Sequence, residues 1–168
     1  MLIELNMNQV TDELLALAAL RGAGAAPRGN EEESPQRLFT RDDIPGLRVV
    51  MRMVFAELVM ELADMVNRCI LDESDPDFHL PAIHQDVPIK LAVEFMHSDD
   101  LPEGMWIPLK RQMEHAVATG TLYWIYTEVD PTVATIMHTR YRAVVDALTE
   151  SLRALTGSDQ PMTRMPHW

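Results

Sequence analysis

Cysteine and basic residues are scarce in this chain. Its 168 residues include one cysteine, and 14 lysines and arginines stand against 26 aspartates and glutamates, which gives a formal net charge of −12. One cysteine excludes an internal disulfide and a zinc site built on cysteines. The acidic balance argues against nucleic-acid binding, because a protein that holds a phosphate backbone needs a positive face. We therefore expect no nucleic-acid partner.

Long apolar runs and an N-terminal leader are also missing. No stretch approaches the ~18 consecutive apolar residues that indicate a membrane span. The most apolar region, residues 49–66, is interrupted by four charged residues, Arg52, Glu57, Glu61 and Asp64. The first residues lack the basic and apolar parts of a secretory signal, and a free Cys69 fits a reducing compartment. The expectation is a cytoplasmic protein with no membrane partner.

Catalytic and nucleotide-binding motifs are absent as well. The sequence has no Gly-x-Ser-x-Gly elbow, no Walker A loop and no Gly-x-Gly-x-x-Gly motif. One pattern suggests a metal, because Glu94 and His97 stand three residues apart, as in helical di-iron sites. Such sites use two of these pairs, and here only Glu57 or Glu61 is available as a further ligand. We expect no catalytic residue, no metal and no cofactor; the alternative is a metal-binding or enzymatic helical bundle that uses Glu94 and His97.

Helical periodicity is the strongest feature that the sequence does have. Hydrophobic residues make up 47% and charged residues 24% of the chain, as in ordinary globular domains. Apolar residues that recur every three or four positions predict helices. The expected helices cover residues 9–20, 43 to about 71, 89–97, 108 onward, and 130 to about 156. The first has Asn8 as its expected N-cap, and the last begins with the capping pair Asp130–Pro131.

Two of these segments also fit a strand. Residues 89–95 form a short apolar run, which periodicity alone cannot assign, and we prefer a helix. Residues 121–127 are rich in β-forming side chains, but the helical pattern continues through them from Leu109. A helix there would place Gly120 where a neighbouring helix can approach closely.

Composition divides the chain into four parts. Residues 22–37 hold three glycines, two prolines and three successive glutamates, and they have no periodic apolar face. We therefore expect a helical arm at 1–21, a flexible linker at 22–40, a helical domain at 41–157 and a tail at 158–168. The fold class is all-α, a four- to five-helix bundle with a tethered N-terminal helix and a short C-terminal tail. Whether the arm packs on its own chain or on a neighbouring copy stays open.

The second helix carries two apolar stripes. The first is the expected core stripe, made of Leu47, Met51, Val54, Leu58, Leu62, Met65 and Cys69. The second lies on another side and consists of Val49, Met53, Ala56, Met60 and Ala63. A surface helix of a monomer needs one apolar face, so a second stripe predicts either a central helix or contact with another chain. Arg48 and Arg52, four residues apart, are candidates for ion pairs with the acidic region 72–103 of a neighbouring copy.

These features favour a non-catalytic structural or adaptor protein that acts by helix-mediated self-association or partner binding. The expected interface residues are Val49, Met53, Ala56, Met60, Ala63, Arg48 and Arg52. The expected partner is a second copy or another protein. In general plan, a small acidic helical unit with an arm and a tail is similar to the small helical head–tail connector proteins of phages, and the similarity is one of architecture alone.

Overall fold

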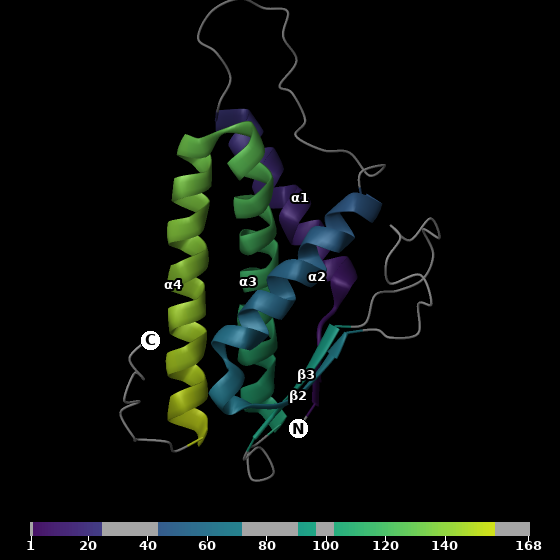
Figure 1. Cartoon of the computed structure of the whole chain (residues 1–168), viewed down its shortest axis with the longest axis vertical. Helices are drawn as coiled ribbons and strands as arrows, with labels where there is room; N and C mark the ends of the chain where they lie inside the picture. The colour runs from purple at the N-terminus through teal and green to yellow at the C-terminus, as the bar shows by residue number, and fades with distance from the viewer. Residues whose placement is uncertain (1, 25–43, 72–90, 97–102, 157–168) are drawn as a thin grey trace, which may run out of the picture.

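The computed structural model describes residues 2–24, 44–71, 91–96 and 103–156 (Figure 1). These residues form four α-helices: α1 (Met7–Gly24), α2 (Ile44–Glu61), α3 (Glu103–Val129) and α4 (Pro131–Thr156). They also form three strands, β1 (Leu2–Glu4), β2 (Val66–Leu71) and β3 (Leu91–Phe95), and a 3₁₀ turn at Ala63–Met65. The expected tail and all but the first three residues of the expected linker lie outside the described residues.

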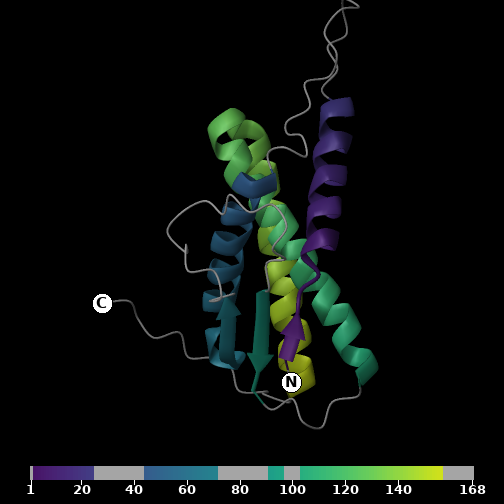
Figure 2. The ribbon, with the colours of Figure 1, turned by 90° about the vertical axis from the view of Figure 1, so that its right-hand side faces the viewer.

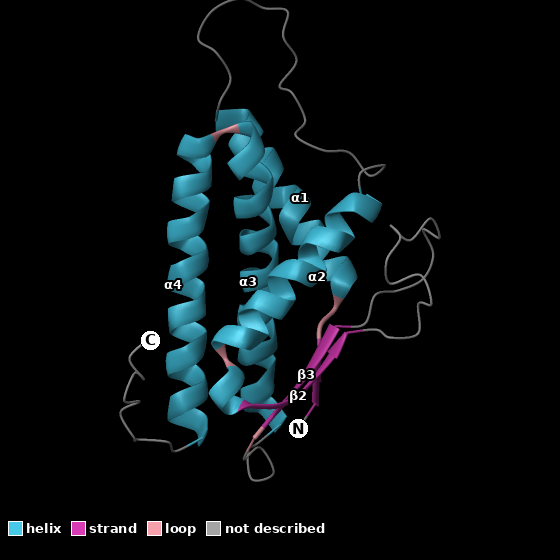
Figure 3. Ribbon diagram, in the orientation of Figure 1, coloured by secondary structure: helices cyan, strands magenta, loops and turns pink. Residues whose placement is uncertain are grey.

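Helix α3 is the central element of the molecule. It runs antiparallel to α4, and α2 crosses α3 diagonally (Figure 3). Figure 2 shows α1 and α2 on opposite sides of α3. The tight turn from α3 to α4 follows from its sequence, because the Asp130 carboxylate accepts hydrogen bonds from the backbone N–H groups of Thr132 and Val133 at 3.0 and 3.2 Å. The predicted start of the last helix is therefore confirmed.

The strands make a small antiparallel sheet in the order β1-β3-β2. Ile3 of β1 pairs with Val93 of β3, and both side chains are buried in the core. Phe95 at the end of β3 stacks on Trp106 of α3 with ring centroids 6.3 Å apart. The described chain is thus mostly helical, as its periodicity predicts, and adds a sheet that the all-α expectation did not include.

One expected helix, 89–97, is wrong and another is too long, because strand pairing overrides local periodicity. The second helix ends at Glu61 rather than near residue 71, and residues 66–71 turn back as β2 to pair with β3. Residues 91–95 form β3, which is the strand alternative for that segment. Both runs are short, each holds two residues of high β propensity, and each pairs with a strand outside its own local segment. Residues 121–127, in contrast, are helical within α3, as preferred.

Strand formation also changes the expected place of Cys69. Its side chain is exposed on β2, a strand at the edge of the sheet, so its assignment to the buried stripe is wrong. Partial burial still raises the pKa of the Cys69 thiol.

The starts of the helices differ from expectation by up to five residues. Helix α1 begins at Met7, after Asn6, whose side-chain oxygen accepts a hydrogen bond from the Gln9 backbone N–H at 3.3 Å. Asn6 rather than Asn8 is therefore the N-cap. Helix α3 begins at Glu103 and contains Pro108 about one turn inside, where a proline removes a single helical hydrogen bond.

The closest helix contact lies at Gly120 of α3. A Cβ atom added there would lie 2.5 Å from Val54 Cγ1 of α2 and 3.0 Å from Tyr141 Cε2 of α4. No side chain larger than hydrogen fits without moving these neighbours. The expectation that Gly120 permits close helix approach is confirmed, and it fixes how near α2 and α4 lie to α3.

We predict that Gly120→Ala lowers the free energy of unfolding by about 1–3 kcal/mol, because overpacking a dense core forces its neighbours apart. The loss opposes the roughly 1 kcal/mol by which alanine improves helix propensity. Urea unfolding followed by circular dichroism measures it. Gly104→Ala is the matched control, because a Cβ atom at Gly104 meets nothing within 4 Å. A Gly120→Ala variant as stable as the Gly104→Ala variant would contradict the packing argument.

The hydroxyl of Tyr141 provides a second test of this core. Among the described residues it is buried without a hydrogen-bond partner. Burial, and then the nearby carboxylates of Glu61 and Glu57, raise the pKa of Tyr141 to about 12. In the unfolded chain a tyrosine pKa is about 10, so the unfolded state loses this proton first as pH rises.

We therefore predict that stability falls between about pH 10 and about pH 12, and that Tyr141→Phe removes part of this fall. Unfolding of both proteins should be measured across that range. Other groups titrate there too, but both proteins share them, so the difference between the two curves isolates Tyr141. Parallel curves would show that the folded state does not hold this proton.

Candidate interaction surface on helix α2

Helix α2 buries one face against α3 and the sheet. Five members of the expected core stripe, Leu47, Met51, Val54, Leu58 and Leu62, are at most 6% exposed. Phe55, fully buried, widens the same face. With 3.6 residues per turn, these positions leave the opposite side of the helix free of core contacts.

The second apolar stripe lies on that opposite side. Val49 is 44% exposed, Met53 46% and Met60 77%, and Ala56 between them is half-buried. Ala63 is exposed but lies past the end of α2, in the 3₁₀ turn. We call Val49, Met53, Ala56 and Met60 the α2 stripe. The structure therefore brings four of the five predicted apolar interface residues onto one helix side and leaves three of them substantially open to solvent.

Acidic side chains border the α2 stripe on one side and are held in place by neighbouring helices. Glu57 accepts a hydrogen bond from the indole N–H of Trp124 in α3 at 3.3 Å. Glu61 pairs with the guanidinium of Arg142 in α4 at 2.5 Å. Both residues are thus used within the chain to orient α2 on the α3–α4 pair.

Arg48 and Arg52 border the stripe on its other side. Both are half-buried, since their stems lie along the helix. The Nε atom of Arg52 is buried without a hydrogen-bond partner among the described residues. Their expected partners in residues 72–103 fall largely outside the described residues, so the ion pairs with a neighbouring copy stay a prediction.

The alternative of a helical metal pair at Glu94 and His97 does not fit the fold. Glu94 lies on β3, and His97 is outside the described residues. The two residues therefore do not share a helix face. Across residues 2–24, 44–71, 91–96 and 103–156, no three histidine, cysteine, aspartate or glutamate side chains gather closely enough to hold a metal ion.

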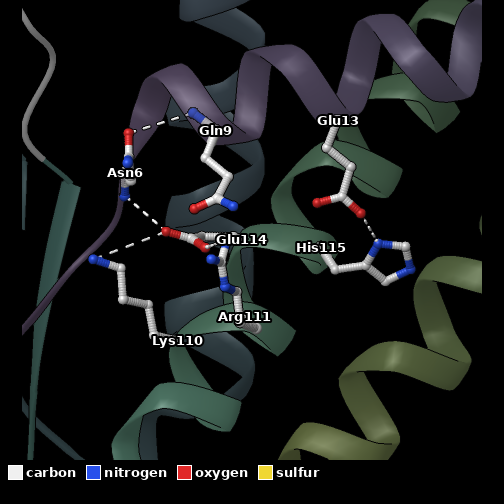
Figure 4. Close-up of polar contacts among 7 residues, drawn as sticks. All are labelled: Asn6, Gln9, Glu13, Lys110, Arg111, Glu114 and His115. Carbon is white, nitrogen blue, oxygen red and sulfur yellow. Dashed lines mark hydrogen bonds and ion pairs between the residues drawn. The ribbon is translucent and has the colours of Figure 1, made fainter.

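Helix α1 packs on α3, away from the α2 stripe. Val10, Leu14 and Ala18 of α1 are buried in the common core. The start of the helix is fixed by Glu114 of α3, which is 1% exposed. Its carboxylate accepts a hydrogen bond from the backbone N–H of Asn6 at 2.9 Å (Figure 4). In the described chain the arm therefore packs on its own body.

Two basic side chains and a second polar pair complete this contact. Arg111 lies 3.4 Å and Lys110 4.0 Å from the Glu114 carboxylate oxygens. About two helical turns further along, in α1, the Glu13 carboxylate contacts Nδ1 of His115 (Figure 4). A buried carboxylate requires such partners, because losing its water without replacement costs several kcal/mol. The sequence did not point to Glu114, because its partner, the Asn6 backbone N–H, lies 108 residues away in the chain.

We predict that Glu114→Ala lowers the free energy of unfolding by about 1–3 kcal/mol, because the Asn6 N–H loses its charged acceptor and the link between α1 and α3 is broken. Glu114→Gln keeps an acceptor oxygen and should lose less. Glu150→Ala on the exposed side of α4 is the control for removing a carboxylate. Urea unfolding of the three variants measures the differences. Equal stability of Glu114→Ala and Glu150→Ala would show that the carboxylate does not fasten α1.

Within the described residues, no helix is both long and apolar enough to cross a membrane. Comparison of the chain with protein-family models, with curated proteins and with solved structures found no match. A function for the α2 stripe therefore follows from its own geometry and chemistry.

Proposed function

We propose that this protein is a non-catalytic structural or adaptor protein that works by helix-mediated association through α2. The observation that carries the proposal is the exposure of Val49, Met53 and Met60 on the side of α2 opposite the core. Contiguous apolar surface of this kind marks interaction sites in soluble proteins. The working environment that we propose is the cytoplasm, and the first partner to test is a second copy of the chain.

Burial of the α2 stripe supplies a driving force of useful size. Removing one large apolar side chain from water contributes about 1.5–3 kcal/mol, and three such side chains are substantially exposed. Methionine suits this role, because its unbranched, polarizable side chain adapts to the shape of a partner. An 18-residue helix is about 27 Å long, enough for a contact over several turns.

A symmetric pairing of two α2 helices is the simplest closed arrangement. In a twofold dimer the same patch meets itself, so one stripe covers the other and no open chain of subunits forms. Helix α1 does not compete for this surface, because its core residues Val10, Leu14 and Ala18 are buried against α3. The acidic residues beside the stripe also have partners within the chain, since Glu57 accepts a hydrogen bond from Trp124 and Glu61 pairs with Arg142.

We predict that Met53→Glu combined with Met60→Glu leaves the helical content unchanged and lowers the mass of the protein in solution. Two charges on each copy would lie in the buried contact, and an unpaired charge is costly to bury. Light scattering over a concentration series measures mass, and circular dichroism measures helical content.

Met105→Glu is the matched control, because Met105 has the same exposure as Met53 but lies on α3. It should keep the mass of the parent protein. A parent protein that is monomeric at every concentration would contradict the proposal. Unfolding of the double variant would do so as well, since it would place the stripe in the monomer core.

A further inference from the structure

A cleft of about 300 Å³ lies between α1, α3 and α4, away from the α2 stripe. Its apolar wall includes Leu17 of α1 and Met137 and Val144 of α4. Its polar groups are His115 and Thr119 of α3 and Arg140 of α4. Ligand sites typically combine mostly apolar walls with a few converging polar groups, and about 300 Å³ is the lower end of their size range.

The hydroxyl of Thr119 lacks the bond that other helical threonines make. Thr121 and Thr127 of the same helix donate to the backbone carbonyl four residues earlier, at 2.7 and 2.9 Å. Three threonines of α4, Thr135, Thr139 and Thr149, do the same. Thr119 is only 2% exposed, and its oxygen has no hydrogen-bond partner among the described residues. A polar group bound in the cleft would supply the missing partner after a rotation about one side-chain bond.

Arg140 brings a positive charge to the same cleft. It is exposed on α4 and forms no ion pair with any described residue. Arg142, two residues on, is in contrast paired with Glu61 and Asp146. Arg140 is thus available to a ligand, and a guanidinium binds a carboxylate best through two parallel hydrogen bonds.

His115 adds a second polar group beside Arg140. Glu13 occupies its Nδ1 atom, and Figure 4 shows the other ring nitrogen on the side that is turned toward α4. The pairing with Glu13 therefore orients the ring with Nε2 toward the cleft. With Nδ1 donating to Glu13, Nε2 accepts a hydrogen bond when the ring is neutral and donates one when the ring is protonated.

We propose that this cleft binds an amphipathic carboxylate, a compound with a compact apolar body and one carboxylate group. The apolar body packs between Leu17, Met137 and Val144. The carboxylate pairs with the Arg140 guanidinium and reaches the Thr119 hydroxyl or His115 Nε2. The volume is roughly twice that of an apolar cavity that holds one benzene ring, so an eight-carbon chain or a fused pair of rings is of suitable size.

The test uses octanoate and 2-naphthoate as probes, titrated into the full chain. Calorimetry measures affinity and stoichiometry, and methyl NMR reports on Met137. We expect saturable one-to-one binding by at least one probe, with a shift of the Met137 methyl signal. Octanol has the same apolar chain without the charge and should bind at least about tenfold more weakly, because it cannot form the two charge-assisted bonds to Arg140. Absence of saturable binding by both carboxylates would overturn the proposal, as would equal binding of octanol.

Matched variants assign the binding to this cleft. Arg140→Gln should weaken binding at least about tenfold, whereas Arg142→Gln makes the same charge change on the same helix and should leave it unchanged. Thr119→Val keeps the shape of the side chain without its hydroxyl and should weaken binding several-fold. Ala143→Trp places a large ring on the exposed rim of the cleft and should abolish binding, with folding checked by circular dichroism.

Equal affinity of Arg140→Gln and Arg142→Gln would contradict the assignment of the carboxylate to Arg140. Unchanged affinity of the folded Ala143→Trp variant would place the ligand elsewhere and overturn the proposal. The Met53→Glu plus Met60→Glu variant should bind the carboxylate normally, because the α2 stripe lies on a different helix from every lining residue. The outcome for the cleft is therefore independent of self-association.

Discussion

The close approach of α2 and α4 to Gly120 is the contact on which the rest of the structure depends. A hydrogen atom at this position lets Val54 and Tyr141 press against the α3 backbone. The two helices thereby pack directly on α3, and this packing sets the rotation of α2 about its own axis. Because α2 buries the face that contains Val54, its opposite face must point outward with Val49, Met53 and Met60 on it. The proposed interface is thus a consequence of how the core is packed.

Polar contacts then fix the orientation of α1 and α2 on α3. Glu61 with Arg142 and Glu57 with Trp124 link α2 to the α3–α4 pair. Glu114 fixes the start of α1 on the other side of α3. The exposed links contribute little energy each, whereas the buried carboxylate has much to lose if its partners are removed. Directional bonds therefore define the orientation of α1 and α2, while the apolar core supplies most of the stability.

Elements that depend on neighbours in sequence could be predicted, and those that depend on distant partners could not. The start of α4 follows from Asp130 and Pro131 alone, and the buried face of α2 follows from its apolar spacing. The strand at 66–71 forms because β3 lies beside it. The apolar residues up to Cys69 recur at helical spacing, so the sequence predicted a longer helix there instead. The α2 stripe could be identified from the sequence because its apolar residues recur every three or four positions. Arg140, Thr119 and His115 share a cleft only after α3 and α4 pack side by side, so nothing in their sequence spacing pointed to a site.

The three strands come from widely separated parts of the chain, and this has a consequence during synthesis. Among the described strands β1 pairs with β3 alone, and the residues of β3 follow it by roughly 90 positions. A ribosome adds about 5–20 residues per second, so the N-terminal strand waits on the order of ten seconds before its partner exists. Leu2, Ile3 and Leu5 are without a sheet during that interval. The residues of β1 therefore leave the ribosome well before their partner strand, and the nascent chain carries their apolar side chains unpaired during that interval.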